Sequence, residues 1–472
     1  MKSIVYSKWG LPTVVFLILT VVGGAFGQPD ASAPTGSATT SGKVVPNVQS
    51  NPVGSQSDLN APLVTKTASV APASLKADIA FPVLADVEIP GHSGILVQTL
   101  DGKTVVENLP DSTFNPASNV KIATAYAVLK TFGPDFRFPT QVWTDGTFDE
   151  ATSTLHGNLY ISGRDPVFGF EHGISIANSL NQIGIKEVIG DLIVTDNFAM
   201  NYSGSPVRSG QSLFAVMDAS KRSSAATATW LSFLANSGKN GTIKGVPSIT
   251  FSGATFVQPI PSSLTLVMTH ESAPMKDIVK ATLCYSNNFL SERLADMLGG
   301  AYAVARIVQL NTGVGSNEFS IQTASGLGTN RVTPTAMIKL LRTLRNELAR
   351  NRMTFADIMP VAGIDKGTLE NRFDTDFSEG SVVGKTGTLG NTDGGVSTLS
   401  GEINTRKGKL LFVIFNQRGS VNRFRTFQNY YVSLIQGQFG GAADMGYKPI
   451  SLDARMARSR ITYPASRVVA GN

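Results

Sequence analysis

Cysteine is almost absent from this chain of 472 residues, which contains only Cys284. A single cysteine excludes an intrachain disulfide, and its place in an apolar run indicates a packed side chain rather than a reactive thiol. Histidine is scarce too, and the four copies, His92, His156, His172 and His270, show no metal-ligand spacing. Their number leaves a Ser-His-Asp triad open, but no G-x-S-x-G nucleophile elbow accompanies them. We therefore expect no metal and no cofactor.

Long apolar runs are also missing, except near the N-terminus. Lys2 and Lys8 form a basic stretch before an apolar segment over residues 11–26, and Ala25-Phe26-Gly27 is typical of a cleavage site. We interpret residues 1–27 as a signal peptide, with an uncleaved membrane anchor as the alternative. The apolar segment is short for a spanning helix, which favours cleavage. We expect an exported protein of the periplasm or cell-wall space, with no other contact to a membrane.

A clear excess of positive over negative charge is found only at the two ends of the chain. The net charge is +6, and residues 451–472 hold four arginines against one aspartate. The remainder has no basic patch interleaved with aromatic residues, so we expect no nucleic-acid partner. Residues 28–80, rich in Ser, Pro, Ala and Thr without periodicity, predict a disordered linker. Residues 441–472 read as a basic, solvated tail, with attraction to an anionic envelope polymer as the alternative.

Three short motifs follow one another in an informative order. Ser118-Asn119-Val120-Lys121 comes first, Ser286-Asn287-Asn288 follows 168 residues later (286 − 118), and Lys385-Thr386-Gly387 follows after 99 more (385 − 286). S-x-N also occurs at Ser179 and Ser420, so the order of all three carries the information. This order is that of a serine acyl-transfer site whose proton acceptor is a lysine.

The first motif opens a predicted buried helix. Asn115-Pro116 is typical of a helix start, residues 118–131 lack Gly and Pro, and Gly133-Pro134 ends the pattern. Because residues three apart share a helix face, Lys121 can place its amine beside the Ser118 oxygen and take its proton. In the first turn, Ser118 keeps a free backbone N–H, which can form half of an oxyanion hole.

The third motif lies on a predicted strand. Strands over residues 396–404 and 410–415 follow it, which makes a three-stranded antiparallel meander. Gly387 leaves the backbone open to the close approach of a ligand. The N–H of Thr388 is then the natural second oxyanion donor.

The rest of the pattern predicts an α+β fold, in which an antiparallel sheet is covered by helices and an all-α lobe lies beside it. Asp101-Gly102 lies between two short apolar runs and predicts a hairpin that opens the sheet. Residues 138–269 form an inserted, strand-rich module with one helical stretch at 174–185. Helices are expected over residues 273–299, 334–348 and 422–436.

These motifs resemble those of the penicillin-recognising serine enzymes. Residues 360–369 (PVAGIDKGTL), Ser325-Gly326-Leu327 with residues 330–334, and residues 157–161 with Asp165-Pro166 narrow the resemblance. It is to the low-molecular-mass class C penicillin-binding proteins, which are D-alanyl-D-alanine carboxypeptidase/endopeptidases, over roughly residues 85–440. The resemblance implies a β-lactamase/transpeptidase-like domain over residues 81–137 and 270–440, interrupted by the insert. One departure is Thr323, where the family usually has an Asp.

The resemblance implies peptidoglycan stem peptides as substrates and β-lactams as inhibitors. Ser118 would attack the penultimate D-alanine carbonyl, and Lys121, with a pKa lowered by burial and by Lys385, would accept the proton. Ser286, backed by Lys385, would protonate the leaving amine, and Asn288 would orient Lys121. The terminal carboxylate would be held by three residues of the third motif and its flank, Lys385, Thr386 and Thr388.

Two other functions remain open from the residues. A serine β-lactamase shares all three motifs, but it needs a base for the deacylating water, usually a Glu on a loop before K-T-G, and no such loop is marked here. A non-catalytic peptidoglycan-binding module could keep the fold, but such proteins usually lose a motif residue. We therefore favour a serine D-Ala-D-Ala carboxypeptidase, with endopeptidase action as an addition.

Overall fold

The computed structural model describes residues 75–239, 241, 243 and 245–465. The predicted signal peptide and residues 28–74 of the predicted linker lie outside this part of the chain. The last residues of that linker are ordered, because Lys76 and Ala77 pair with Val106 and Glu107 in a sheet. The linker prediction was wrong for these residues.

The first sheet has six strands in the order β1-β3-β2-β17-β16-β15, and all its neighbours are antiparallel. Its strands are β1 (Lys76–Ala77), β2 (His92–Thr99), β3 (Thr104–Asn108), β15 (Val382–Leu389), β16 (Val396–Thr405) and β17 (Gly408–Gln417). The predicted hairpin (β2–β3) and the predicted meander (β15–β17) are confirmed, and β2 joins them by pairing with β17. The strand with the K-T-G motif, β15, lies at the edge.

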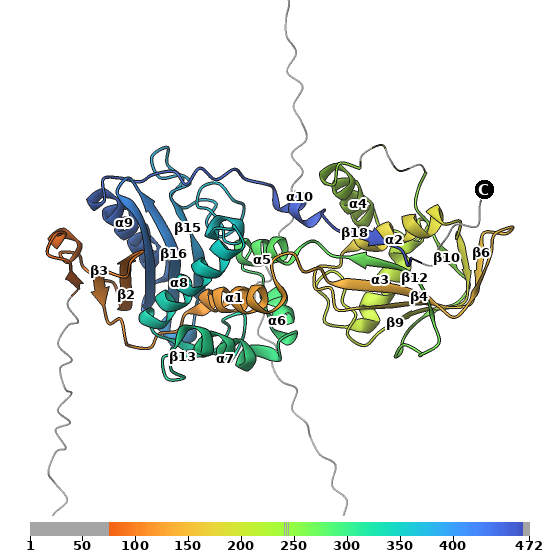
Figure 1. Cartoon of the computed structure of the whole chain (residues 1–472), viewed down its shortest axis with the longest axis horizontal. Helices are drawn as coiled ribbons and strands as arrows, with labels where there is room; N and C mark the ends of the chain where they lie inside the picture. The colour runs from red at the N-terminus through yellow and green to blue at the C-terminus, as the bar shows by residue number, and fades with distance from the viewer. Residues whose placement is uncertain (1–74, 240, 242, 244, 466–472) are drawn as a thin grey trace, which may run out of the picture. The chain divides into compact units, whose positions relative to one another are not determined.

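Helices cover both faces of this sheet (Figure 1). On β17, Leu411, Val413 and Phe415 pack into the core that contains α8 and α1, whereas Leu410, Phe412 and Ile414 pack into the core that contains α9. Because both faces are buried, β17 reads as a continuous apolar run rather than an alternating one. The helices of this domain are α1 (Val120–Phe132), α5 (Met275–Cys284), α6 (Asn288–Asp296), α7 (Gly300–Thr312), α8 (Pro334–Arg350) and α9 (Val421–Gln438).

Short elements complete this domain. They are the 3-10 helices η1 (Pro82–Leu84), η2 (Ala117–Asn119), η3 (Phe355–Asp357) and η4 (Thr392–Gly394), and the two-stranded pair β13 (Phe319–Ser320) and β14 (Arg331–Val332). The expected helix over residues 273–299 is divided into α5 and α6, with a break at residues 285–287. The expected α+β class, with an antiparallel sheet between helices, is confirmed.

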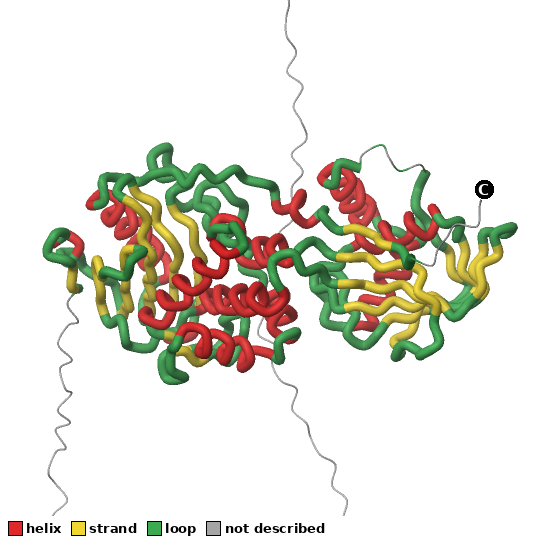
Figure 2. Tube along the Cα trace, in the orientation of Figure 1, coloured by secondary structure: helices red, strands yellow, loops and turns green. Residues whose placement is uncertain are grey.

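The insert is less purely β than the sequence predicted (Figure 2). One sheet runs β11-β9-β7-β4-β12-β18 and another β10-β8-β6-β5. Their strands are β4 (Pro139–Thr144), β5 (Thr147–Asp149), β6 (Thr154–His156), β7 (Leu159–Gly163), β8 (Glu187–Ile189), β9 (Leu192–Val194), β10 (Thr250–Phe251), β11 (Thr255–Val257), β12 (Thr265–Glu271) and β18 (Arg460–Thr462). Several neighbours are parallel, as in β7–β9 and β6–β8.

The insert also contains helices that the sequence argument missed. Only α2 (Phe170–Gln182) was expected, but α3 (Pro206–Met217) and α4 (Ser224–Asn236) are present as well. Both helices begin after a serine, a residue type favoured at the N-cap, so the sequence did contain a signal for their starts. In the structure Ser205 Oγ accepts from Arg208 N, and Ser223 Oγ accepts from Ala226 N. The Ser- and Gly-rich interior of α3 and the Thr residues of α4 lowered their apparent helix propensity.

The predicted solvated tail is partly folded. It forms α10 (Leu452–Met456) and the strand β18, which pairs with β12. Arg455 is 5% exposed and bonds to the fully buried Asp277 at 2.8 Å. The positive charge of this segment is thus used in part within the fold. In the described part of the chain, no helix is both long enough and apolar enough to cross a membrane.

Candidate active site

Ser118 lies in η2, directly before α1, and Lys121 lies in the first turn of α1. Lys121 Nζ donates a hydrogen bond to Ser118 Oγ at 3.0 Å. The same amine donates to Asn288 Oδ1 at 2.7 Å and to the Ser325 carbonyl oxygen at 2.5 Å. Three acceptors from three parts of the chain therefore hold the amine against the hydroxyl. The structure brings these residues of the first two motifs within hydrogen-bond distance.

Burial controls the charge of this amine. Lys121 is 1% exposed, and burial lowers its pKa from 10.5 to about 7, against the opposing effect of the Glu292 charge. A substantial fraction of the amine is then neutral near pH 7, as a proton acceptor must be. Burial also lowers the pKa of Lys385, and the charge of Lys121 lowers it further. The sequence argument expected the charge of Lys385 to lower the pKa of Lys121. In the structure it is the charge of Lys121 that lowers the pKa of Lys385.

Glu292 supports this arrangement from behind and belongs to none of the three motifs. It lies on α6, four residues after Asn288, and accepts hydrogen bonds from Ala324 N at 3.1 Å and Ser325 N at 2.8 Å. The carbonyl of Ser325 is in turn an acceptor for Lys121. Glu292 therefore fixes the backbone that receives the amine. Its i, i+4 spacing from Asn288 on a helix was the signal that the sequence argument overlooked.

Ser286 lies in the break between α5 and α6. Its φ of 54° is in the left-handed region, which a non-glycine residue adopts only at a cost of about 1–3 kcal/mol. Asn287 caps α6 by accepting from Leu290 N at 3.0 Å. Ser286 is thus displaced from the helix axis and lines the same cavity as Ser118. Its hydroxyl has no hydrogen-bond partner among the described residues.

A loop over residues 360–369 packs against the end of α5, just before Ser286. Thr368 N donates to Cys284 O at 3.0 Å, and a Cβ on Gly367 would come within 2.2 Å of that oxygen. Asp365 anchors the loop, since it accepts from the buried Lys280 Nζ at 2.6 Å. Gly367 thus permits the close approach, and Thr368 lines the cavity.

The K-T-G motif forms the opposite wall on β15. Lys385 is fully buried, and its Nζ donates to the Thr386 carbonyl at 2.7 Å rather than to Ser286. Thr386, Gly387 and Thr388 line the cavity. The expected contact of Lys385 with Ser286 is not formed in this structure.

Gly387 also permits a close approach that the sequence argument did not foresee. A Cβ there would meet Thr398 Oγ1 at 2.2 Å and both Ala117 Cβ and Pro116 O at 2.9 Å. The close approach is therefore by the segment that carries Ser118, although Gly387 also lines the cavity. Gly326 has the same relation to this segment, because a Cβ there would lie 2.0 Å from Ala117 O. Two glycines thus allow the backbone before the serine to be held from two sides.

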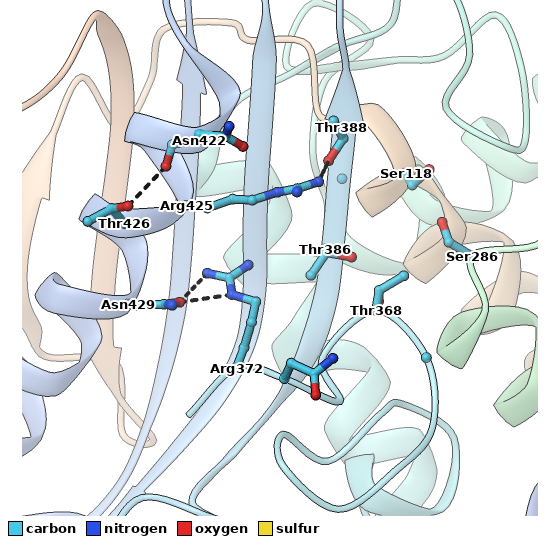
Figure 3. A pocket seen from close by; sticks show the side chains of 13 residues that line it. Ser118, Ser286, Thr368, Arg372, Thr386, Thr388, Asn422, Arg425, Thr426 and Asn429 are labelled. Carbon is cyan, nitrogen blue, oxygen red and sulfur yellow. Dashed lines mark hydrogen bonds between the residues drawn. The ribbon is translucent and has the colours of Figure 1, made fainter. Parts of the chain in front are cut away.

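The cavity between these walls has a volume of about 720 Å³ (Figure 3). Its further lining comes from residues that the motifs do not include: Thr368, Asn371, Arg372, Asn422, Arg425, Thr426 and Asn429. The last four lie on α9, whose positions no local pattern links to the motifs. No group of three or more His, Cys, Asp or Glu side chains among the described residues is arranged to hold a metal ion.

Comparison with known proteins decides the family. A model of the D-Ala-D-Ala carboxypeptidase 3 (S13) family matches residues 75–210 and 245–434, well over half of the chain. The chain belongs to this family. A D-alanyl-D-alanine carboxypeptidase from Actinomadura sp. (strain R39) is 31% identical over 162 residues, which are 31% of this chain and 29% of that protein. The chain therefore matches less than a third of the length of this curated relative.

Solved structures share the fold of this S13 chain. The predatory peptidoglycan endopeptidase Bd3459 from Bdellovibrio bacteriovorus gives a TM-score of 0.66 at 21% identity, covering 80% of this chain and 100% of that one. Its penicillin G-acylated form, in complex with the immunity protein Bd3460, gives 0.65 at 23% identity, covering 76% and 96%. Penicillin-binding protein 4 from Haemophilus influenzae, complexed with a β-lactam, gives 0.55 at 19% identity, covering 77% and 100%. The fold implied by the resemblance is confirmed.

The departure at Thr323 is accommodated in this S13 chain by local hydrogen bonding. Thr323 Oγ1 accepts from Gly326 N at 3.1 Å and donates to Leu327 O at 2.7 Å. A hydroxyl can close a turn in the way that a short carboxylate does. The Ser325-Gly326-Leu327 turn therefore keeps a side-chain cap without the Asp.

Proposed function

We propose that this S13-family protein is a serine D-Ala-D-Ala carboxypeptidase of peptidoglycan stem peptides, which also cuts cross-linked peptides. The observation that carries the proposal is the 3.0 Å contact between Lys121 Nζ and Ser118 Oγ, on an amine whose pKa is lowered to about 7. A nucleophile hydrogen-bonded to a base that is neutral near the working pH is what acyl transfer to serine needs.

Acylation follows from this pair. Ser118 Oγ attacks the carbonyl carbon of the penultimate D-alanine, and its proton passes to Lys121. The backbone N–H of Ser118, in the first turn, is one oxyanion donor. The second is the N–H of Thr388, because Gly384 N points off the open edge of β15 to Pro360 O and alternate residues of a strand point the same way.

The remaining motif residues act on the leaving group. Ser286, in the cavity beside Ser118, relays to the departing amine the proton that Lys121 accepted from Ser118, and Asn288 orients the Lys121 amine. Thr386 and Thr388, with the buried Lys385 behind them, hold the terminal carboxylate. Water then hydrolyses the ester and frees Ser118.

A β-lactam would acylate Ser118 in the same way and leave slowly. Glu292, the carboxylate whose charge acts on Lys121, uses both oxygens to accept backbone N–H groups and does not line the cavity, so it is not placed to activate a water there. This argues for slow deacylation and against a β-lactamase. Rapid multiple turnover of a chromogenic cephalosporin would reverse this conclusion.

The decisive experiment is incubation of the purified protein with an acyl-D-Ala-D-Ala peptide, with freed D-alanine as the readout. We expect release by the wild type and none by Ser118→Ala. Binding of the peptide without release by either protein, over a range of pH, would instead favour a binding module.

We further propose that the protein is exported, because residues 1–27 have the features of a signal peptide. Mass spectrometry of the protein from the cell envelope should find an N-terminus at Gln28. An intact Met1 in the membrane fraction would show a retained anchor, and recovery from the cytoplasm would contradict export.

A further inference from the structure

The backbone before Ser118 is held by a side-chain network that none of the three motifs includes. Asn115 is fully buried, and its Oδ1 accepts a hydrogen bond from Ala117 N at 3.0 Å. Its Nδ2 donates to Asp393 Oδ2 at 2.8 Å and to Gly328 O at 2.9 Å. The amide oxygen and both amide hydrogens are therefore used. Asn115 thus ties the residue before the serine to two segments that lie far away in the chain.

Ala117 needs this support because its backbone is strained. Its φ of 46° lies in the left-handed region, which a residue with a side chain keeps only where neighbouring groups hold it. The hydrogen bond from its own N–H to Asn115 Oδ1 is such a restraint. Because Ala117 directly precedes Ser118, its conformation sets the direction of the serine N–H and of the serine hydroxyl.

The Asp393 carboxylate fixes which way the Asn115 amide faces. Its Oδ2 accepts from Asn115 Nδ2, so the amide nitrogen, and not the amide oxygen, lies on that side. Arg331 holds the carboxylate with two hydrogen bonds, from Nη2 to Oδ1 at 2.8 Å and from Nη1 to Oδ2 at 3.1 Å. Burial opposes ionisation, but the hydrogen bonds from Asn115 and Arg331 keep the pKa of Asp393 below its ordinary 3.8, so the group is charged at neutral pH. A reversed amide would face the carboxylate with its oxygen and leave Ala117 N without its acceptor.

The position of Asp393 in the fold gives this contact a second consequence. Asp393 lies in η4, the turn that joins β15 to β16. Thr388, whose N–H is the proposed second oxyanion donor, lies near the end of β15 that enters this turn. The bond from Asn115 to Asp393 therefore connects the two segments that supply the two donors. An oxyanion hole depends on donors held in place before the reaction, so a looser connection should slow the chemical step.

Resting on the proposed function, we propose that Asp393 is a positioning residue for acyl transfer. Through the Asn115 amide it holds Ala117 in its strained conformation. It thereby sets where the N–H and hydroxyl of Ser118 lie relative to the N–H of Thr388. Asp393 is not among the residues that line the cavity. Its loss should therefore slow acylation without weakening the binding that precedes it.

The test separates binding from acylation in the full chain. Acylation by a fluorescent penicillin is followed over a range of penicillin concentrations, which gives the dissociation constant of the first complex and the acylation rate constant. Asp393→Gly removes the carboxylate without backbone strain, because glycine readily adopts the φ of 50° found there. We expect the rate constant to fall about tenfold or more, since a misplacement of about 1 Å can cost about 10²-fold, and the dissociation constant to change less than about threefold.

Further variants ask whether Asp393 acts through Asn115. The acylation rate constant should also fall in Asn115→Ala, and adding Asp393→Gly to it should cost little more, because residues that act as a unit are not additive. Asp393→Asn keeps an oxygen for the Asn115 amide and should retain more of the rate than Asp393→Gly. The matched control is Asp218→Gly in the insert, whose carboxylate also pairs with a cation, Lys221, at 3.1 Å, and it should be acylated like the wild type.

The pH dependence is a readout that general damage to the site would move. The midpoint of about 7 expected from Lys121 should be unchanged in Asp393→Gly, because the hydrogen-bond partners of that amine do not include Asp393. A shifted midpoint would place the effect on the base and overturn the proposal.

The other outcomes also decide. Acylation of Asp393→Gly at the wild-type rate overturns the proposal, and so does an equal loss in Asp218→Gly, which would be a general effect of destabilisation. Equal losses in Asp393→Asn and Asp393→Gly, or a full further loss on adding Asp393→Gly to Asn115→Ala, would show that the effect does not pass through the Asn115 amide and would overturn it too.

Failure of the proposed function is distinguishable from failure of this inference. If penicillin does not acylate the wild type at Ser118, the function fails, and the positioning role fails with it. Thermal melting shows which variants keep their fold. Should Asp393→Gly not fold, Asp393→Ser takes its place in every comparison, because a hydroxyl is one bond shorter than the carboxylate that reaches Asn115.

Discussion

At the scale of single residues, the site depends on an amine that the fold keeps largely neutral. A lysine in water holds its proton until far above neutral pH, so it cannot serve as a base there. Burial lowers the pKa of Lys121 to about 7, and hydrogen bonds to Ser118, Asn288 and Ser325 fix its position. The same burial that costs stability thus suits Lys121 to its proposed role of proton acceptor.

The first prediction concerns pH. The neutral form of Lys121 predominates above its pKa of about 7, so the rate of acylation by a fluorescent penicillin should rise with pH through about 7 and then level off. The rate of labelling can be measured by stopping the reaction at set times between pH 5 and 9. Ser118→Ala serves as the control for non-specific labelling. A rate that falls with rising pH through this range would contradict the role of Lys121.

The second prediction concerns Glu292. Its charge raises the pKa of Lys121, so Glu292→Gln should shift the midpoint of that pH profile downward, while the amide oxygen can still accept one of the two backbone N–H groups. Glu318→Gln is a control, because that carboxylate pairs weakly with Lys339 at 4.0 Å. An upward shift, or the same shift in the control, would show that Glu292 does not act on the amine electrostatically.

At the scale of elements, the serine is placed by backbone packing. The segment leading into α1 is held between the Ser325-Gly326-Leu327 turn and β15, with Gly326 on one side and Gly387 on the other. Ala117, at a φ of 46°, is strained next to Ser118, the proposed nucleophile. Such strain persists only when neighbouring elements hold the segment from several directions.

The third prediction uses two glycines of one turn. Gly326→Ala would place a Cβ 2.0 Å from Ala117 O, whereas Gly328→Ala would meet only Gln322 Oε1 at 3.8 Å, although both have positive φ. In both variants the backbone strain should lower the free energy of unfolding by about 1 kcal/mol. Only Gly326→Ala should also lose most of its penicillin labelling, because the backbone of Ser118 must move. Equal labelling by the two variants would show that this contact does not position the serine.

At the scale of the whole described chain, the C-terminal segment belongs to the fold. It returns after α9 to pack α10 against α5 and to pair β18 with β12 of the insert. Its principal contact is Arg455 with the buried Asp277, to which Arg458 adds a bond at 3.1 Å. A segment that composition describes as a basic tail therefore supports the helix that leads into Ser286.

The fourth prediction follows from that contact. Arg455→Met should lower the free energy of unfolding by about 3 kcal/mol, the low end for breaking a buried ion pair, because Arg458 still contacts Asp277. Arg460→Met, which removes an exposed pair with Glu271, should cost less than about 1 kcal/mol. Denaturant unfolding of both variants measures the difference. Similar losses would show that the buried pair has no special weight.

The sequence by itself determined the parts of this protein that depend on local pattern. The helix that begins near Ser118, the strand with Lys385, the hairpin at Asp101-Gly102 and the order of the three motifs follow from periodicity, turn residues and spacing. Each of these features is stabilised mainly by interactions between residues close together in the chain, so a short stretch of sequence is enough to predict it.

Only the tertiary structure decided what depends on residues far apart. The lowered pKa of Lys121, the support from Glu292, the break at Ser286, the position of Arg372 against α9 and the folded C-terminal segment all arise from contacts across long stretches of chain. Burial and electrostatic effects depend on what surrounds a group in space, and no local pattern of residues records that surrounding.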